Sequence, residues 1–109
     1  MDVLYQSGLL RVARTYEPSG LRVVGDVDAF TVPVLHSALR TLLHDGGDIH
    51  LELSELQFMD VAGLELVVST ARDLTDGRRL YLHALSPHLR KVMELVGWDR
   101  TPGLGFVEE

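Results

Sequence analysis

Two hydrophobic periods alternate between residues 49 and 96, and this alternation constrains the fold more than any other feature. Ile49, Leu51 and Leu53 occupy every second position, which is typical of a half-buried strand. Residues 80–84 form a second such run. The apolar residues with helical spacing are Leu64, Val67, Val68, Ala71 and Leu74, and later Leu89, Val92, Met93 and Val96. This strand–helix–strand–helix order predicts parallel strands joined by right-handed crossovers.

The region before residue 49 predicts a β-hairpin and a first helix. Residues 10–16 and 21–24 have strand-like patterns, and Pro18-Ser19-Gly20 between them is typical of a turn. The following helix has Thr31 as its candidate N-cap and ends at Gly46-Gly47. Because the hairpin is antiparallel, we expect an α/β domain with a mixed sheet of four to five strands and about three helices.

The third helix has the clearest predicted ends. Ser86-Pro87 combines a capping hydroxyl with a proline that the first helical position tolerates, and Gly97 closes the helix. The segment 99–109 is expected to be a tail, with Phe106-Val107 as a candidate edge strand. We therefore expect one domain over residues 1–109, with its core at about 9–98.

Composition excludes several classes of protein. No apolar run approaches the ~18 residues of a membrane helix, so no membrane insertion is expected. The chain has no cysteine, which excludes disulfides and thiolate chemistry and makes the cytoplasm the default location. Ten basic residues against sixteen acidic ones give a net charge of −6, which disfavours nucleic acid as a partner.

The sequence contains no recognisable catalytic or metal-binding motif. The five histidines form no His-x-His or His-Glu-x-x-His arrangement. Alternation could place His50, Glu52 and His83 on the outer face of neighbouring strands, but random surface polarity explains this set better. No serine lies in a Gly-x-Ser-x-Gly elbow, and Gly46-Gly47 lacks the lysine of a phosphate loop. We predict a protein that is not an enzyme and has no metal and no cofactor.

Acidic residues follow two of the predicted strands. Asp26 and Asp28 come after the strand at 21–24, and Asp60 comes after the strand at 49–53. On a structural interpretation, Asp60 is an N-cap and the other two form a turn. On a functional interpretation, both segments connect a strand to a helix, where open sheets usually place their sites. The pattern alone leaves both interpretations open.

Three ordered segments resemble the STAS domain family, the fold of bacterial anti-sigma-factor antagonists. Residues 21–28 resemble the family's strand ending in Gly-x-Leu/Val-Asp, and residues 49–60 resemble its signature of a hydrophobic strand, Leu-Ser-x-Leu-x-Phe-Met/Ile-Asp. Residues 79–97 resemble its closing strand, helix and glycine. The resemblance covers about residues 9–98 in family order.

The resemblance implies a non-catalytic, protein-binding regulator. In the antagonists, an anti-sigma factor that is also an ATPase-fold serine kinase phosphorylates the serine after the strand-end aspartate. Asp60 matches that aspartate, Val61 falls on the phosphorylated serine, and Gly63 matches a glycine. The switch position therefore lacks a phosphoacceptor. The partner-binding residues implied are Asp26, Asp28, Asp60, Val61, Ala62, Gly63 and Leu64.

Two features leave the choice of partner open. Relatives often continue into a last amphipathic helix, whereas this sequence ends at Phe106-Val107-Glu108-Glu109, so we expect that helix to be short or absent. The missing phosphoacceptor favours constitutive binding without identifying the partner. The alternative is a STAS subunit of another assembly, such as a lipid-transport ATPase complex or a stressosome-like scaffold.

Overall fold

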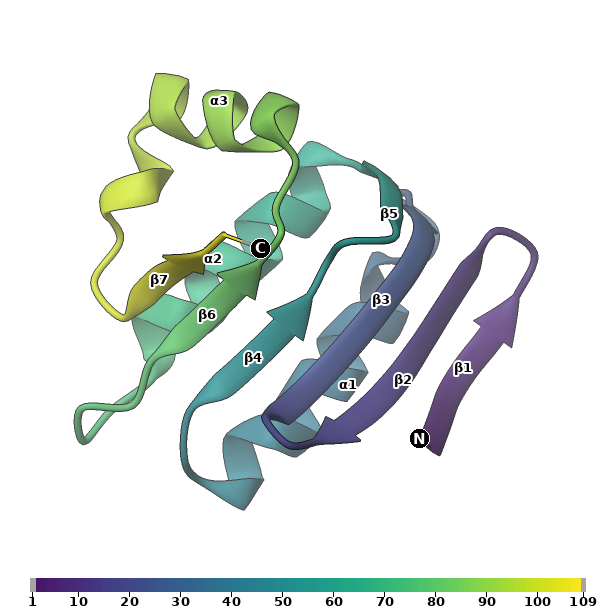
Figure 1. The fold of residues 1–109 in the computed structure, drawn as a ribbon, viewed down its shortest axis with the longest axis horizontal. Helices are drawn as coiled ribbons and strands as arrows, with labels where there is room; N and C mark the ends of the chain where they lie inside the picture. Colours follow the sequence, from purple (N-terminus) through teal and green to yellow (C-terminus); the bar gives the residue numbers. More distant parts are fainter. Residues whose placement is uncertain (1, 109) are drawn as a thin grey trace.

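The computed structural model describes residues 2–108 as a mixed seven-stranded sheet with three helices (Figure 1). The strand order is β1-β2-β3-β4-β6-β7, and β5 pairs with β3 outside this path. The strands are β1 (Asp2–Ser7), β2 (Leu10–Tyr16), β3 (Ser19–Val27), β4 (Ile49–Glu52), β5 (Leu56–Met59), β6 (Leu80–His83) and β7 (Leu104–Val107). The helices are α1 (Val32–Asp45), α2 (Val61–Asp73) and α3 (Pro87–Val96), followed by the short 3-10 turn η1 (Trp98–Arg100). The α/β class and the three helices are confirmed.

The sheet has more strands than the four to five predicted. Strand β1 pairs antiparallel with β2, but its side chains are mostly exposed, so it has no buried apolar stripe to reveal it in the sequence. Strand β5 was not predicted because it is separated from β4 by a short connection and is only four residues long. The predicted edge strand at Phe106-Val107 is present as β7, parallel to β6.

The pairing directions confirm the hairpin and the crossovers. Strands β2 and β3 are antiparallel, whereas β3, β4, β6 and β7 are parallel neighbours in that order. Strand β3 has two partners on one side: residues 20–22 pair with β4, and residues 25–27 pair with β5. Helices α1 and α2 lie behind the sheet in Figure 1, and α3 lies beyond the end of β6.

The core lies between the sheet and its helices. It contains alternate residues of the inner strands and the apolar stripes of the helices. Its largest buried side chains include Leu21, Leu35, Leu39, Leu42, Ile49, Leu51, Leu64, Leu80, Leu82 and Met93. No helix within residues 2–108 is long and apolar enough to cross a membrane.

The predicted helix ends are largely confirmed. Ser86 Oγ accepts a hydrogen bond of 3.2 Å from the amide of Leu89, and Gly97 closes α3 in the left-handed conformation. Thr31 occupies the N-cap position of α1, but its hydroxyl does not cap the helix. It accepts instead from the amide of Asp28 at 2.9 Å. Thr31 is therefore the N-cap by position, as predicted, and the preceding turn uses its hydroxyl.

The predicted buried stripe of α3 is only half correct. Leu89 and Met93 are buried, and Val92 packs partly against the core. Val96 is 55% exposed, although the helical period places it on nearly the same side as Leu89. The last turn of α3 therefore extends past the surface that its first two turns cover.

Candidate functional site

The two strand-to-helix connections that carry the aspartates lie side by side. Val27, the last residue of β3, is the register partner of Met59, the last residue of β5. The amide of Asp60 donates a hydrogen bond of 2.8 Å to the carbonyl of Val27. Asp28 and Asp60 therefore follow neighbouring strands at one edge of the sheet, where parallel strands commonly place binding sites. Asp26 lies within β3, opposite Phe58, rather than in the loop expected for it.

Asp28 organises the connection between β3 and α1. Its Oδ1 accepts hydrogen bonds from the amides of Phe30 at 2.9 Å and Thr31 at 3.0 Å, and from the Thr31 hydroxyl at 3.1 Å. This is the side-chain-stabilised turn that aspartate favours. The turn leaves the ring of Phe30 91% exposed.

Asp60 is the N-cap of α2. Its backbone is extended, with φ −63° and ψ 153°, and its Oδ1 accepts from the amide of Ala62 at 2.8 Å. The carboxylate therefore satisfies one of the free amides at the start of the helix. The structural interpretation of Asp28 and Asp60 is thus confirmed: Asp28 holds a turn and Asp60 caps a helix.

The first residues of α2 divide into an outer and an inner pair. Val61 is 57% exposed and Ala62 is also exposed, whereas Gly63 and Leu64 are buried. A Cβ on Gly63 would lie 2.9 Å from Met59 Cγ and 3.2 Å from Val27 Cγ1, so the helix packs closely on the ends of β3 and β5. Gly63 and Leu64 therefore support the exposed pair by packing against the core and do not themselves belong to the exposed surface.

Apolar and acidic side chains share this edge of the sheet. We call the set Asp28, Phe30, Phe58, Asp60, Val61 and Ala62 the edge surface. Sequence reasoning missed Phe30 and Phe58, which is 49% exposed. Both were detectable in principle, because Phe30 precedes the apolar stripe of α1 and Phe58 alternates with the buried Met59. Exposed aromatic residues are common at the centres of protein interfaces.

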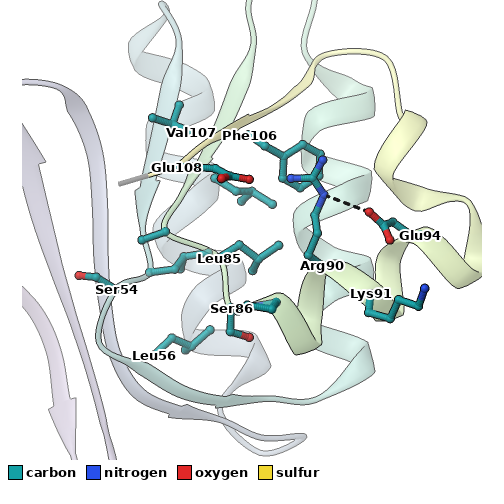
Figure 2. Close-up of a pocket in the computed structure, with 14 residues that line it drawn as sticks. Ser54, Leu56, Leu85, Ser86, Arg90, Lys91, Glu94, Phe106, Val107 and Glu108 are labelled. Carbon is teal, nitrogen blue, oxygen red and sulfur yellow. Dashed lines mark ion pairs between the residues drawn. The ribbon is translucent and has the colours of Figure 1, made fainter.

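A cavity of about 610 Å³ lies between helix α3 and the ends of β6 and β7 (Figure 2). It is bounded by the β4–β5 connection with Leu56, the β6–α3 connection with Leu85, helix α3 and the end of β7. The Arg90 guanidinium carbon lies 3.7 Å from the centroid of the Phe106 ring, and Arg90 Nε lies 3.8 Å from a Glu94 carboxylate oxygen. The contact with the Phe106 ring joins α3 to β7, whereas the ion pair with Glu94 lies within α3.

The histidine set is assembled as the alternation indicated. His50 and His83 lie on neighbouring strands, with His50 Nδ1 2.7 Å from His83 Nε2, and Glu52 is the register partner of His83. Burial, and secondarily the proximity of His83, lowers the pKa of His50 below its ordinary value. Within residues 2–108, no three histidine or carboxylate side chains are arranged to hold a metal ion.

Comparison with known proteins gives a consistent result. The family model described as "Mlab, STAS domain" matches residues 10–108. The anti-sigma-B factor antagonist of Staphylococcus aureus is 33% identical over 79 residues, which are 71% of this chain and 73% of that protein. The Staphylococcus epidermidis protein of the same name is 30% identical over the same shares.

Solved structures show the same relationship. An anti-sigma factor antagonist from Mycobacterium paratuberculosis superposes with a TM-score of 0.73 at 26% identity, covering 88% of this chain and 83% of that one. The unphosphorylated antagonist SpoIIAA gives a TM-score of 0.66 at 26% identity, covering 87% and 86%. The phosphorylated Bacillus SpoIIAA gives 0.67 at 26% identity, covering 92% and 90%.

Proposed function

The chain belongs to the STAS domain family and is homologous to anti-sigma-factor antagonists, and from this we infer that it binds an anti-sigma factor in the bacterial cytoplasm. The inferred function is binding and not catalysis. The partner has the ATPase-like fold of a serine kinase, as the resemblance to the antagonists implies. The contact is made by the edge surface.

The exposure of Val61 at the start of α2 carries this proposal. The side chain is 57% exposed, although valine is usually buried, and Phe30 and Phe58 are exposed at the same edge. Burial of Val61 against a partner would contribute up to about 1.5 kcal/mol to binding. The apolar side chains supply the contact area, and Asp28 and Asp60 supply a polar rim.

The charge of the edge surface defines the complementary face of the partner. The carboxylates of Asp26, Asp28 and Asp60 lie at or beside this edge, and the chain as a whole carries a net charge of −6. An apolar pocket bordered by lysine or arginine would match it, because complementary charges speed association and fix orientation. A partner with an acidic rim would be disfavoured.

We further propose that the contact is not switched off by phosphorylation at residue 61. In the antagonists, the residue at this position is a serine, and phosphate there adds about −1.5 to −2 charges beside the partner. A valine cannot accept phosphate and keeps the position neutral. Val61 therefore holds the surface permanently in the charge state of an unmodified antagonist.

A second candidate function is membership of another assembly, in which the same edge makes a constant contact. The family model that covers residues 10–108 is described by the name Mlab and not as an antagonist, which favours keeping this candidate. Subunits of a lipid-transport ATPase complex or a stressosome-like scaffold are the alternatives.

One capture experiment distinguishes the two. The chain and its Val61→Asp variant are immobilised in parallel, and proteins retained from a lysate of the source bacterium are identified by mass spectrometry. We expect an anti-sigma factor to be retained by the parent and not by the variant. Retention of a transporter ATPase or of scaffold proteins would support the second candidate. Retention of the same proteins by the parent and by the variant would contradict binding through the edge surface.

A further inference from the structure

Two imidazole rings join β4 to β6 on the face of the sheet opposite the core. His50 and His83 alternate with the buried Leu51 and Leu82, so they lie on the outer face. His50 is the register partner of Tyr81, which makes the two histidines diagonal neighbours. Their facing nitrogens, Nδ1 of His50 and Nε2 of His83, are 2.7 Å apart. This distance is a hydrogen bond between the rings.

The surroundings hold the His50 ring on one side and leave space on another. The Tyr81 ring stacks on His50 with centroids 4.9 Å apart and an interplanar angle of 21°. A small cavity of about 250 Å³ separates the pair from Thr15 at the end of β2 and from Glu17 and Pro18 in the following turn. The ring of His50 therefore has room to move if the contact with His83 is lost.

Charged and titratable groups face the pair from every neighbouring element. Strand β4 and the residue before it contribute Glu52 and Asp48, β3 contributes Arg22 as the register partner of Glu52, and the β2–β3 turn contributes Glu17. Directly before β6, the guanidinium carbon of Arg79 lies 5.8 Å from the centroid of the Tyr81 ring. Asp48 favours a charged His50, but burial and His83 outweigh it and lower the pKa of His50.

The hydrogen bond between the rings depends on how many protons they carry. When both rings are neutral, one N–H donates to the bare nitrogen of the other, and the same bond persists when one proton is added. When both rings are protonated, two N–H groups and two positive charges face each other at 2.7 Å. No acceptor then remains between the rings, so the contact cannot survive.

We propose that the His50–His83 pair is a proton-sensitive contact, which joins β4 to β6 while it carries at most one added proton and opens when it takes up a second. The second proton comes from solvent, and the freed His50 ring moves into the cavity towards Glu17. The pair lies beside Gly20 in the first half of β3, whereas the edge surface follows Val27 at its other end. Acidification thus acts on the sheet without placing a charge in the edge surface.

The lowered pKa of His50 determines how the stability of the fold changes with pH. An unfolded histidine has a pKa of about 6.5, and the folded His50 has a lower one. Between these two values the unfolded chain binds more protons than the folded chain, so stability decreases as the pH falls. The contribution of neutral His50 is complete above about pH 6.5 and is lost as the pH falls through its folded pKa.

Titration of the histidine ring signals by NMR, from about pH 8 to about pH 5, tests the proposal on the parent chain. We expect His50 to titrate with a midpoint below that of an ordinary histidine, because burial and the neighbouring His83 oppose its protonation. In His83→Gln, the midpoint of His50 should rise, because the competing charge is removed and glutamine can accept a hydrogen bond. His36→Gln, on the exposed face of α1, is the matched control and should leave His50 unchanged. A His50 midpoint that is the same in His83→Gln as in the parent would overturn the proposal.

Urea unfolding at about pH 7.5 and about pH 5.5 provides a second readout. The parent should lose more stability over this interval than the double variant His50→Gln/His83→Gln, because only the parent carries the pair. Equal losses in the two proteins would overturn the proposal. If the double variant does not fold, the shift of the His50 midpoint in His83→Gln decides.

Discussion

The amide of Asp60 donates a hydrogen bond of 2.8 Å to the carbonyl of Val27, and this contact aligns the two connections that form the edge surface. It links the first residue after β5 to the last residue of β3. The turn held by Asp28 and the helix start capped by Asp60 are therefore fixed relative to each other. A surface whose two halves are held in this way needs little rearrangement to bind a partner.

Val61→Asp should weaken partner binding at least about tenfold, or about 1.4 kcal/mol, because it places a charge in the centre of the edge surface. The fold should be retained, since an acidic residue in the first turn of a helix is favourable. Isothermal calorimetry with the captured partner measures the change. Val96→Asp is the matched control, since Val96 is 55% exposed at the end of α3. Equal losses in the two variants would exclude a specific role for Val61.

Val61→Ser should make the chain a substrate for an anti-sigma kinase. The variant places a hydroxyl next to the capping Asp60, at the position that the resemblance to the antagonists assigns to their phosphorylated serine. Intact-mass spectrometry after incubation with the partner and ATP should show one added phosphate in the variant and none on residues 60–63 of the parent. Peptide mapping separates this product from modification at exposed hydroxyls such as Ser54. An unmodified variant that still binds the partner would contradict the assignment of residue 61.

Asp60→Ala should destabilise the domain by about 1 kcal/mol, because α2 loses the side-chain acceptor for the amide of Ala62. Asp60→Asn should retain most of this stability, since asparagine is an equally good cap. Urea unfolding measures both. The asparagine variant also separates capping from binding: if it is stable but binds the partner more weakly, the charge of Asp60 contributes to the interface.

Leu64→Ala should cost about 2–5 kcal/mol, because Leu64 is buried beneath the first turn of α2. Leu95→Ala should change stability by less than about 0.5 kcal/mol, since Leu95 is an exposed helical leucine of α3. Comparison of the two by thermal unfolding tests whether Leu64 supports the edge surface through packing. A Leu64→Ala variant of undiminished stability would contradict this supporting role.

The sequence was sufficient to predict elements whose signals are local. The ends of α3 at Ser86 and Gly97, the cap at Asp60 and the parallel order of β4 and β6 all follow from spacing and residue type. Strands β1 and β5 could not be predicted, because pairing with a neighbour and not a buried stripe makes them strands. Leu64 is buried and Val61 is exposed, and this difference depends on how α2 packs on the sheet, which the sequence does not determine.

The candidate site was half predictable for the same reason. Asp28 and Asp60 could be placed at strand ends, but their proximity depends on the pairing of β3 with β5. The contact between His50 and His83 required the register of β4 against β6, which alternation does not fix. The sequence pattern places Gly20 in a turn. In the structure Gly20 pairs with His50, so closely that a Cβ there would lie 1.7 Å from the carbonyl oxygen of His50.

Strand β3 pairs with two different strands along its length, so its two halves have different neighbours. Residues 20–22 are held by β4, and residues 25–27 are held by β5. A load applied to β5 by a bound protein reaches the β4–β6 pair along β3 or through residues 53–55, which connect β4 to β5. The edge surface and the histidine contact lie near opposite ends of β3, and amide exchange in β5 should respond to the partner while exchange in β4 responds to acid.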